Sequence, residues 1–473
     1  MGLFDLACRR LIQPLWARRE SRHAERFHRE LERRQFDPPH VIRARQDAAL
    51  RRLVRHAVET TTYYAEQFRK LHLRVEDIRG FDDLDQLPLL MKADIRERGA
   101  SLLSNRYPRS VLTRKKTSGS TGVPLEVRLD PAGLEWKRAC TLRADEWSGW
   151  QRGQRVAKVW GNPDYRHFGI RGLVRNALYE RAVYLDTLQM APETIGRFAR
   201  AIARSKPELI FGHAHSVFLL ADHIARADLP SYRPAGIITT AMILHDWQRR
   251  RIESVFGCRV TNRYGCEEVS LIACECGEHN GLHVNSDSVF VEVLRDGRPV
   301  NPGEPGDIVL TDLCNFAMPL LRYRVGDVGV LADRICPCGR GMPLIESLQG
   351  READYVVTAA GNYISGISLT ENFAVLVPGI AQIQIVQEEV ERFMFRIVRD
   401  RAFGPASEKA LADLVIDRFG PATQWRCEFV TAIPREPSGK YRFCISHVVR
   451  PGGTVTPVHP PAKPGEGRKE RAA

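Results

Sequence analysis

The sequence predicts an α/β protein, in which a large multi-layered α/β domain follows a helical N-terminal extension and precedes a small α+β domain. A chain of 473 residues is too long for one core, because single hydrophobic cores stop growing at roughly 250 to 300 residues. Between residues 105 and 345, short apolar segments alternate with helical patterns, which is typical of α/β folds. We expect domain boundaries at 1–104, 105–349 and 350–449, and a disordered tail at 450–473 that is rich in Pro, Gly and charge.

The elements follow from hydrophobic periodicity. Leu3, Phe4 and Leu11 recur near helical spacing among arginines, and residues 50–68 have the pattern of a second amphipathic helix. The large domain contains strand candidates and helical patterns, and the small domain contains two more strand candidates. The strand candidates of the large domain are 155–160, 209–213, 235–241, 258–265, 289–294 and 307–313; its helices are 217–227 and 246–256; the small domain has strands at 380–387 and 393–398.

The formal net charge of +13 favours anionic partners such as nucleotides, nucleic acid or an anionic membrane surface. No zinc-finger, RNA-recognition or basic-helix pattern supports a specific nucleic-acid function. The basic N-terminus allows a weak peripheral membrane contact, but a helix packed on its own domain with a solvated basic face is the simpler interpretation. With no run of 18 apolar residues and no cleavable signal, we expect a cytoplasmic protein whose eleven cysteines stay reduced.

The first chemical motif is KKTSGSTGVP at residues 115–124. A loop of glycines and hydroxyl residues can turn its amides toward a phosphate, because glycine permits positive φ and close approach. The motif is neither the P-loop of nucleotide triphosphatases nor a dinucleotide-binding fingerprint. Taken alone, it is more typical of a solvent-exposed connector than of a phosphate-binding loop, and Lys115 and Lys116 either steer an anion or solvate the loop.

Four further motifs follow in order: RYGCEEV with Glu267 and Glu268, LRYRVGDVGVL with Asp327, GREADYVV with Arg351 and Asp354, and PREPSGKYRF with Lys440. Each alone fits a helix start, a strand end, a linker or a surface turn. Together with TSGSTGVP they resemble the adenylate-forming superfamily of acyl-CoA synthetases, adenylation domains and luciferases. The resemblance is greatest to the phenylacetate-CoA ligase family and to its branch from capsular-polysaccharide gene clusters, and it extends from about residue 45 to 448.

The resemblance implies an ATP-dependent acid–thiol ligase that forms an acyl adenylate and transfers the acyl group to coenzyme A. It assigns the ATP phosphates to a loop, Mg²⁺ to Glu268, the ribose to Asp327, adenine stacking to Tyr264, catalysis to Lys440 and the hinge of a mobile small domain to Asp354. These roles suit the chemistry, since carboxylates bind Mg²⁺ and accept hydrogen bonds from hydroxyls. The full expected ATP-binding set is Thr117, Ser118, Gly119, Ser120, Thr121, Gly122, Tyr264, Gly265, Asp327 and Arg351.

The cysteines indicate a separate metal site. Cys274 and Cys276 form one C-x-C pair, followed by His279 and His283, and Cys336 and Cys338 form a second pair. Thiolates at this spacing beside an imidazole are typical of structural zinc, which takes four ligands. We favour Cys276, His283, Cys336 and Cys338, with Cys274 and His279 as alternates; free thiols in loops remain the other interpretation.

The acid and its acceptor stay open at the level of sequence. By the resemblance, residues 211–216 and 239–244 wall the acyl pocket, and ligases of the phenylacetate branch commonly carry Ser-Glu where this chain has Thr240 and Ala241. The acceptor is coenzyme A or, alternatively, a non-CoA acceptor in polysaccharide or secondary-metabolite biosynthesis. A non-catalytic, membrane-associated assembly protein of polysaccharide biosynthesis is the alternative from another class, and a homodimer is left open.

Overall fold

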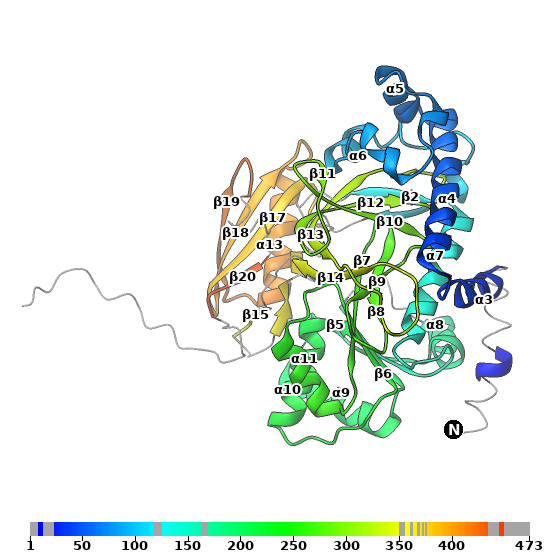
Figure 1. The fold of residues 1–473 in the computed structure, drawn as a ribbon. Helices are drawn as coiled ribbons and strands as arrows, with labels where there is room; N and C mark the ends of the chain where they lie inside the picture. The colour runs from blue at the N-terminus through cyan, green and yellow to red at the C-terminus, as the bar shows by residue number, and fades with distance from the viewer. Residues whose placement is uncertain are drawn as a thin grey trace, which may run out of the picture.

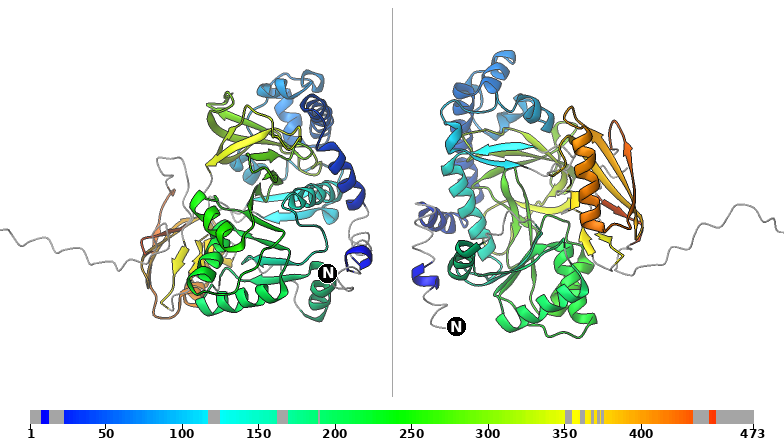
Figure 2. Two further views of the ribbon diagram at one scale, coloured as in Figure 1. Left: turned by 60° about the horizontal axis from the view of Figure 1, so that its bottom comes forward. Right: turned by 180° about the vertical axis from the view of Figure 1, so that it is seen from behind.

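The computed structural model describes most of the chain. The described residues are 8–12, 23–116, 125–161, 169–188, 190–349, 355–359, 363–366, 369–370, 373, 376–433 and 444–448. Figure 1 shows a large body of helices and strands with a smaller unit, formed by β15 to β20 and α13, on one flank. The turned view in Figure 2 keeps this unit on the flank opposite the N-terminal helix α4. The expected α/β class with a separate C-terminal domain is confirmed.

The N-terminal extension is helical where it is described. A short turn at Cys8–Ile12 is followed by helices, of which α4, α5 and α6 pack apolar residues on the large sheet and α3 packs on α7. These helices are α3 (Ala24–Arg34), α4 (Pro39–Thr60), α5 (Thr62–Lys70), α6 (Lys92–Arg98) and α7 (Pro131–Glu146). The predicted helices at Leu3 to Leu11 lie largely outside the described residues.

The expectation of one helix over residues 50–68 is wrong, because the chain breaks between α4 and α5 at Thr61. Thr61 has extended φ and ψ values of −123° and 138°, and its hydroxyl accepts a hydrogen bond from the Tyr64 amide at 3.3 Å. The same hydroxyl donates to the carbonyl of Ala57 at 2.7 Å. A threonine that satisfies both helix ends in this way caps α5, which the hydrophobic pattern alone does not reveal.

A 12-stranded sheet forms the centre of the large domain, in the order β11-β10-β12-β13-β14-β9-β8-β7-β6-β5-β3-β4. Strands β4, β3, β5, β6 and β7 run parallel, and from β7 to β11 neighbouring strands pair antiparallel. The parallel part consists of β3 (Val156–Val159), β4 (Ala182–Leu185), β5 (Leu209–His213), β6 (Gly236–Thr240) and β7 (Val260–Cys266). The antiparallel part adds β8 (Ser270–Glu275), β9 (Leu282–Val284), β10 (Val289–Arg295), β11 (Arg298–Pro299), β12 (Pro305–Asp312), β13 (Tyr323–Leu331) and β14 (Leu344–Gln349).

Helices connect the parallel strands, as right-handed crossovers require. They are α8 (Gly169–Arg175), α9 (Pro192–Ser205), α10 (Ala214–Arg226) and α11 (Asp246–Phe256), of which α9, α10 and α11 enclose a core of aliphatic residues from β3, β5 and β6. A separate hairpin is formed by β1 (Thr113–Lys116) and β2 (Glu126–Leu129). Within the described part of the chain, the helices are all too short or too polar to cross a bilayer.

The C-terminal unit has its own core. A four-stranded sheet in the order β19-β18-β17-β20 packs against α13 (Pro405–Phe419), with Phe393, Phe395 and Phe419 buried between them. The strands are β17 (Ile380–Glu389), β18 (Arg392–Arg399), β19 (Gln424–Phe429) and β20 (Cys444–Ser446), and a small hairpin of β15 (Tyr355–Val357) and β16 (Tyr363–Ser365) precedes them. A core of this size is what a separate small domain requires.

Candidate nucleotide site and cysteine cluster

Two carboxylates accept hydrogen bonds from tyrosines on β7 and β13. Glu268 lies in the β7–β8 turn, is 4% exposed, and accepts a hydrogen bond of 2.8 Å at Oε1 from the hydroxyl of Tyr323. Asp327 in β13 accepts a hydrogen bond of 2.8 Å at Oδ2 from the hydroxyl of Tyr264 in β7. Strand β13 therefore supplies the tyrosine that binds Glu268 after β7, and β7 supplies the tyrosine that binds Asp327 in β13. Hydrogen bonds to charged acceptors fix the orientation of both carboxylates.

Glycines shape the backbone at both carboxylates. A Cβ at Gly265 would lie 2.6 Å from the carbonyl oxygen of Ser270, so the β7–β8 turn closes only with glycine at this position. Gly326, directly before Asp327, has a φ of +90°, which side chains rarely adopt. Gly265 was expected from the motif as an ATP-binding residue, and the structure adds the requirement for close backbone approach.

The N-terminal extension reaches this site through β13. The amide of Leu90 donates to the carbonyl of Arg322 and the amide of Arg324 donates to the carbonyl of Leu90, both at 3.0 Å. Helix α6 begins two residues later, and a Cβ built at Gly326 would lie 3.8 Å from Nζ of Lys92. Half-burial lowers the pKa of Arg96, while the negative charge of Glu268 acts to raise it. The site thus includes cationic side chains that the motifs did not indicate.

The hairpin that leads into the glycine-rich loop contacts the same turn. Lys115 in β1 lies with Nζ 3.5 Å from Oε2 of Glu267 and 3.3 Å from Oγ of Ser270. The sequence left open whether Lys115 steers an anion or solvates the loop. In the structure its ammonium group contacts the turn that carries Glu267. The residues Thr117–Gly122 themselves lie outside the described part of the chain, as do Arg351, Asp354 and Lys440.

A buried lysine supports the turn from behind. Lys137 in α7 donates from Nζ to the carbonyl of Val269 at 2.9 Å and to Oδ2 of Asp312 at 2.6 Å. Val269 directly follows Glu268, so the ammonium holds the backbone of the carboxylate-bearing turn. Sequence analysis missed this role, because Lys137 lies in a helix among other charged residues and only the tertiary structure shows its burial.

The predicted acyl-pocket segments end two neighbouring parallel strands. His213 ends β5 and is paired in register with Thr240, which ends β6. His213 is 3% exposed, its ring lies 4.0 Å from the ring of Trp160, and burial lowers its pKa to about 4. Its imidazole is therefore neutral at neutral pH. The carboxyl ends of parallel strands are where α/β sheets commonly bind ligands.

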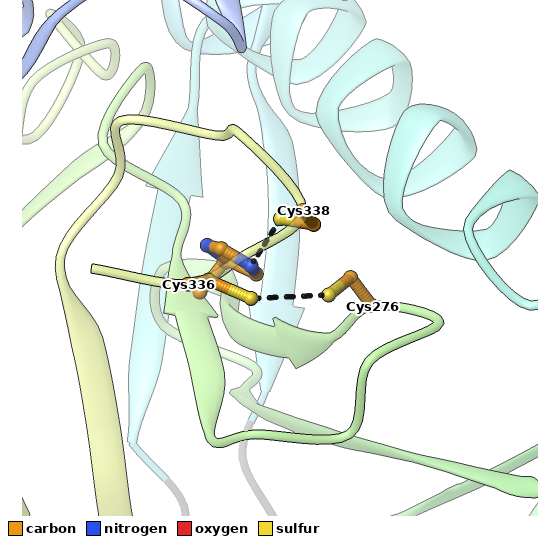
Figure 3. Close-up of side chains that lie close together, drawn as sticks. Cys276, Cys336 and Cys338 are labelled. Atoms are coloured by element: carbon orange, nitrogen blue, oxygen red, sulfur yellow. Dashed lines mark hydrogen bonds between the residues drawn. The ribbon is translucent and has the colours of Figure 1, made fainter. Parts of the chain in front are cut away.

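The cysteine cluster brings together the four favoured residues. Cys276, His283, Cys336 and Cys338 place one donor atom each within 4.8 Å of the others (Figure 3). Sγ of Cys276 lies 3.7 Å from Sγ of Cys336, and Sγ of Cys338 lies 3.3 Å from Nε2 of His283. Burial, together with the Arg340 charge, lowers the pKa of His283 to about 4, so the imidazole is neutral and able to bind a metal.

The alternates point elsewhere. Cys274 is buried with its Sγ 3.9 Å from the carbonyl oxygen of Ala144, and His279 lies with Nδ1 3.3 Å from a carboxylate oxygen of Glu275. Cys274 lies inside β8, whereas Cys276 follows the end of that strand and contacts Cys336. The choice of Cys276 and His283 over the alternates is consistent with this geometry.

Comparison with known proteins agrees with the fold and the motifs. Residues 356–447 match the CapK C-terminal domain. Protein CapK of Staphylococcus aureus is 23% identical over 399 residues, which cover 82% of this chain and 86% of CapK. The phenylacetate–coenzyme A ligase of Thermus thermophilus is 27% identical over 335 residues, which cover 69% of this chain and 74% of the ligase.

Solved structures of 2-hydroxyisobutyryl-CoA ligase have the same fold. The complex with 2-HIB-AMP and CoA in the thioesterification state aligns with a TM-score of 0.59 at 20% identity, and covers 88% of this chain and 92% of the ligase. The complex with R3-HIB-AMP in the postadenylation state aligns with a TM-score of 0.56 at 19% identity, and covers 88% and 91%. The protein therefore has the fold of an adenylate-forming ligase. Its homologues include CapK and phenylacetate–coenzyme A ligases.

Proposed function

We propose that the protein is an ATP-dependent ligase that converts a carboxylic acid to an acyl adenylate and transfers the acyl group to coenzyme A. The observation that carries the proposal is the pair of oriented carboxylates, Glu268 and Asp327, fixed by Tyr323 and Tyr264 beside the hairpin of the glycine-rich loop. The phenylacetate–CoA ligases among its homologues and the ligase fold support the same reaction.

The residues divide the work of adenylation. In the first step a carboxylate oxygen of the acid attacks the α-phosphorus of ATP, the bond to the β-phosphate oxygen breaks, and pyrophosphate leaves. Glu268 would hold Mg²⁺, a hard cation that prefers carboxylate and phosphate oxygens, and the ion would offset the phosphate charge. Asp327 would accept hydrogen bonds from the ribose hydroxyls, because a carboxylate is an acceptor only. Thr117–Gly122 would cradle the phosphates.

The small domain would serve both half-reactions. Lys440 would approach the acyl phosphate during adenylation, and rotation about Asp354 would then admit the thiol of coenzyme A, with Arg351 beside the nucleotide. In the second step the thiol sulfur attacks the acyl carbonyl carbon, the thiol proton is lost, and AMP leaves. Closure of a small domain that completes a site and reopens it is an established use of a hinge.

A non-CoA acceptor is the second candidate, and it rests on the resemblance to the capsular-polysaccharide branch, to which the match of residues 356–447 to the CapK C-terminal domain adds a shared C-terminal domain. The acyl adenylate would then be attacked by a hydroxyl or amine of a sugar or by a carrier protein, as part of polysaccharide biosynthesis. The two candidates share the first half-reaction and differ only in whether coenzyme A is consumed.

ATP–pyrophosphate exchange tests the shared step, using panels of aryl, aliphatic and hydroxy acids. We expect exchange with a cognate acid, loss of exchange in Lys440→Ala, and full exchange in Lys409→Ala, whose lysine is exposed on α13. Equal exchange in Lys440→Ala would overturn the role of that lysine. If the wild-type protein binds no ATP in calorimetry, the assignment fails and a non-catalytic assembly protein becomes the better description.

The cofactors that we propose are ATP, Mg²⁺ and coenzyme A, with a structural Zn²⁺ at the cysteine cluster. The reaction belongs in the cytoplasm, where ATP and coenzyme A are available. Consumption of the free coenzyme A thiol, followed with and without the acid, separates thioester formation from transfer to another acceptor.

A further inference from the structure

The cysteine cluster joins three segments that are distant in sequence. Cys276 directly follows β8, His283 lies in β9, and Cys336 and Cys338 lie in the loop between β13 and β14. Figure 3 shows the side chains of Cys276, Cys336 and Cys338 close together, and the donor atom of His283 lies within 4.8 Å of theirs. Cys276, His283 and Cys336 are at most 2% exposed, and Cys338 is half-buried.

The donor set fits zinc. Three sulfurs and one imidazole nitrogen form a soft, four-ligand set that is common in structural zinc sites. With zinc–sulfur bonds of about 2.3 Å, two sulfurs of a tetrahedral site lie roughly 3.8 Å apart. The separation of 3.7 Å between Sγ of Cys276 and Sγ of Cys336 matches this value. Four protein donors leave no open position for a substrate, so the site is structural.

We infer that these four residues bind one Zn²⁺ ion, and that the ion fixes the far ends of the two strands that carry the nucleotide site. Strand β8 begins two residues after Glu268 and ends directly before Cys276, while β13 carries Asp327 and leads into the loop of Cys336 and Cys338. A six-residue strand spans roughly 20 Å. The ion is therefore too distant for chemistry, but it holds the ends of β8 and β13 opposite the two tyrosine–carboxylate hydrogen bonds.

The loop between β13 and β14 has further contacts that a metal would preserve. The guanidinium of Arg340 lies 4.6 Å from the ring of Trp147, and its Nε donates to Oε1 of Gln35 at 2.9 Å. The indole of Trp147 donates to the same oxygen of Gln35 at 2.9 Å. The loop thus connects the N-terminal extension to the cluster, and losing the metal would loosen that connection as well.

Metal analysis of the full-length protein, purified without chelator or added zinc, tests the site directly. We expect about one zinc per chain, as a four-ligand site requires. Cobalt substitution should give the intense absorption of thiolate–cobalt charge transfer. A chain with no bound metal, with iron in place of zinc, or with a disulfide between Cys276 and Cys336 by mass spectrometry would each overturn the inference.

A matched pair of variants tests the ligand assignment. Cys338→Ser removes a half-buried ligand and should lose zinc, whereas Cys274→Ser, two residues from Cys276 but outside the cluster, should keep it. If Cys338→Ser does not fold, the ligand assignment is tested in the wild type instead, by counting the thiols that become reactive when the protein is treated with chelator. We expect three additional thiols, one for each cysteine of the cluster; release of none would refute the site.

The inferred role as a strand anchor has its own readout. Calorimetry of ATP binding by the wild type before and after chelation should show weaker affinity without zinc, while Cys274→Ser should respond as the wild type does. Unchanged ATP affinity in zinc-free, folded protein would refute the anchoring role and leave the metal site intact. Absence of ATP binding in the zinc-loaded wild type would instead refute the proposed ligase function, so the two failures are distinguishable.

Discussion

The buried pair of Lys137 and Asp312 behind the Glu268 turn offers the sharpest test of how the fold supports the site. The side chains are 2% and 0% exposed, and Nζ of Lys137 also holds the carbonyl of Val269. Burial on its own lowers the pKa of Lys137, but the Asp312 carboxylate outweighs burial and the pKa is raised. The ammonium therefore remains charged at neutral pH.

Lys137→Met keeps most of the side-chain length and removes the charge. The variant leaves the carboxylate of Asp312 buried without its cation, and breaking one partner of a buried pair costs about 3 to 5 kcal/mol. That loss is a large fraction of the roughly 5 to 15 kcal/mol by which folded proteins are stable. Equilibrium unfolding in urea, followed by tryptophan fluorescence, measures it.

The double variant Lys137→Met with Asp312→Leu separates charge burial from packing. Replacing a whole buried pair with apolar residues is often neutral, so the double variant should regain most of the stability lost in Lys137→Met. It should not regain ATP affinity, because the Val269 carbonyl beside Glu268 still lacks its donor. A loss below about 1 kcal/mol in Lys137→Met, the value of an exposed pair, would refute this reasoning.

Three further predictions concern the site itself. Tyr323→Phe removes the hydrogen bond to Glu268, and hydrogen bonds to charged acceptors contribute at least about 1.5 kcal/mol. The kcat/KM for ATP in pyrophosphate exchange should therefore fall about tenfold. An unchanged value would contradict the role of Glu268. Arg96→Gln should raise the KM for ATP, whereas Arg98→Gln on the same helix, which pairs with Glu66 at 2.6 Å, should not; equal KM values in the two variants would exclude Arg96. Burial lowers the pKa of His213 to about 4, so this histidine takes up a proton in the unfolded state first as the pH falls. The free energy of unfolding should therefore drop by about 2 kcal/mol from pH 7 to pH 5 on account of this histidine. Urea unfolding at the two pH values should show that His213→Gln removes this drop.

Local sequence patterns predicted the elements whose stability is local. The strand expected at 209–213 is β5 and the helix expected at 246–256 is α11, each with the same bounds. Both have strong periodicity and clear flanking signals, which reduce the ambiguity of a short apolar segment. The break at Thr61 was missed, because a capping threonine in the run Thr60–Thr62 leaves the hydrophobic spacing of the two helices almost continuous.

The candidate site was predictable only in part. Glu268, Asp327 and the cysteine cluster follow from spaced motifs; the structure places the four residues of the cluster close together and each carboxylate against a tyrosine, while their roles stay predictions. The hydrogen bonds from Tyr323 and Tyr264 depend on how β7 and β13 are placed in the sheet, where three other strands lie between them. No local sequence pattern encodes that placement. The roles of Lys137 and Arg96 depend on burial, which the sequence of a charged helix does not show.

The structure also bears on which acid the enzyme would take. Ala241, directly after β6, has a φ of +66°, which is a left-handed conformation. This conformation costs a residue with a side chain roughly 1 kcal/mol and persists where the surroundings enforce it. The resemblance places a glutamate at this position in ligases of the phenylacetate branch. Ala241 follows Thr240, the strand partner of His213, and an alanine beside that pair together with the neutral imidazole of His213 leaves this edge of the sheet less charged than a glutamate would. A screen for the cognate acid is therefore best begun with aliphatic and hydroxy acids rather than with phenylacetate.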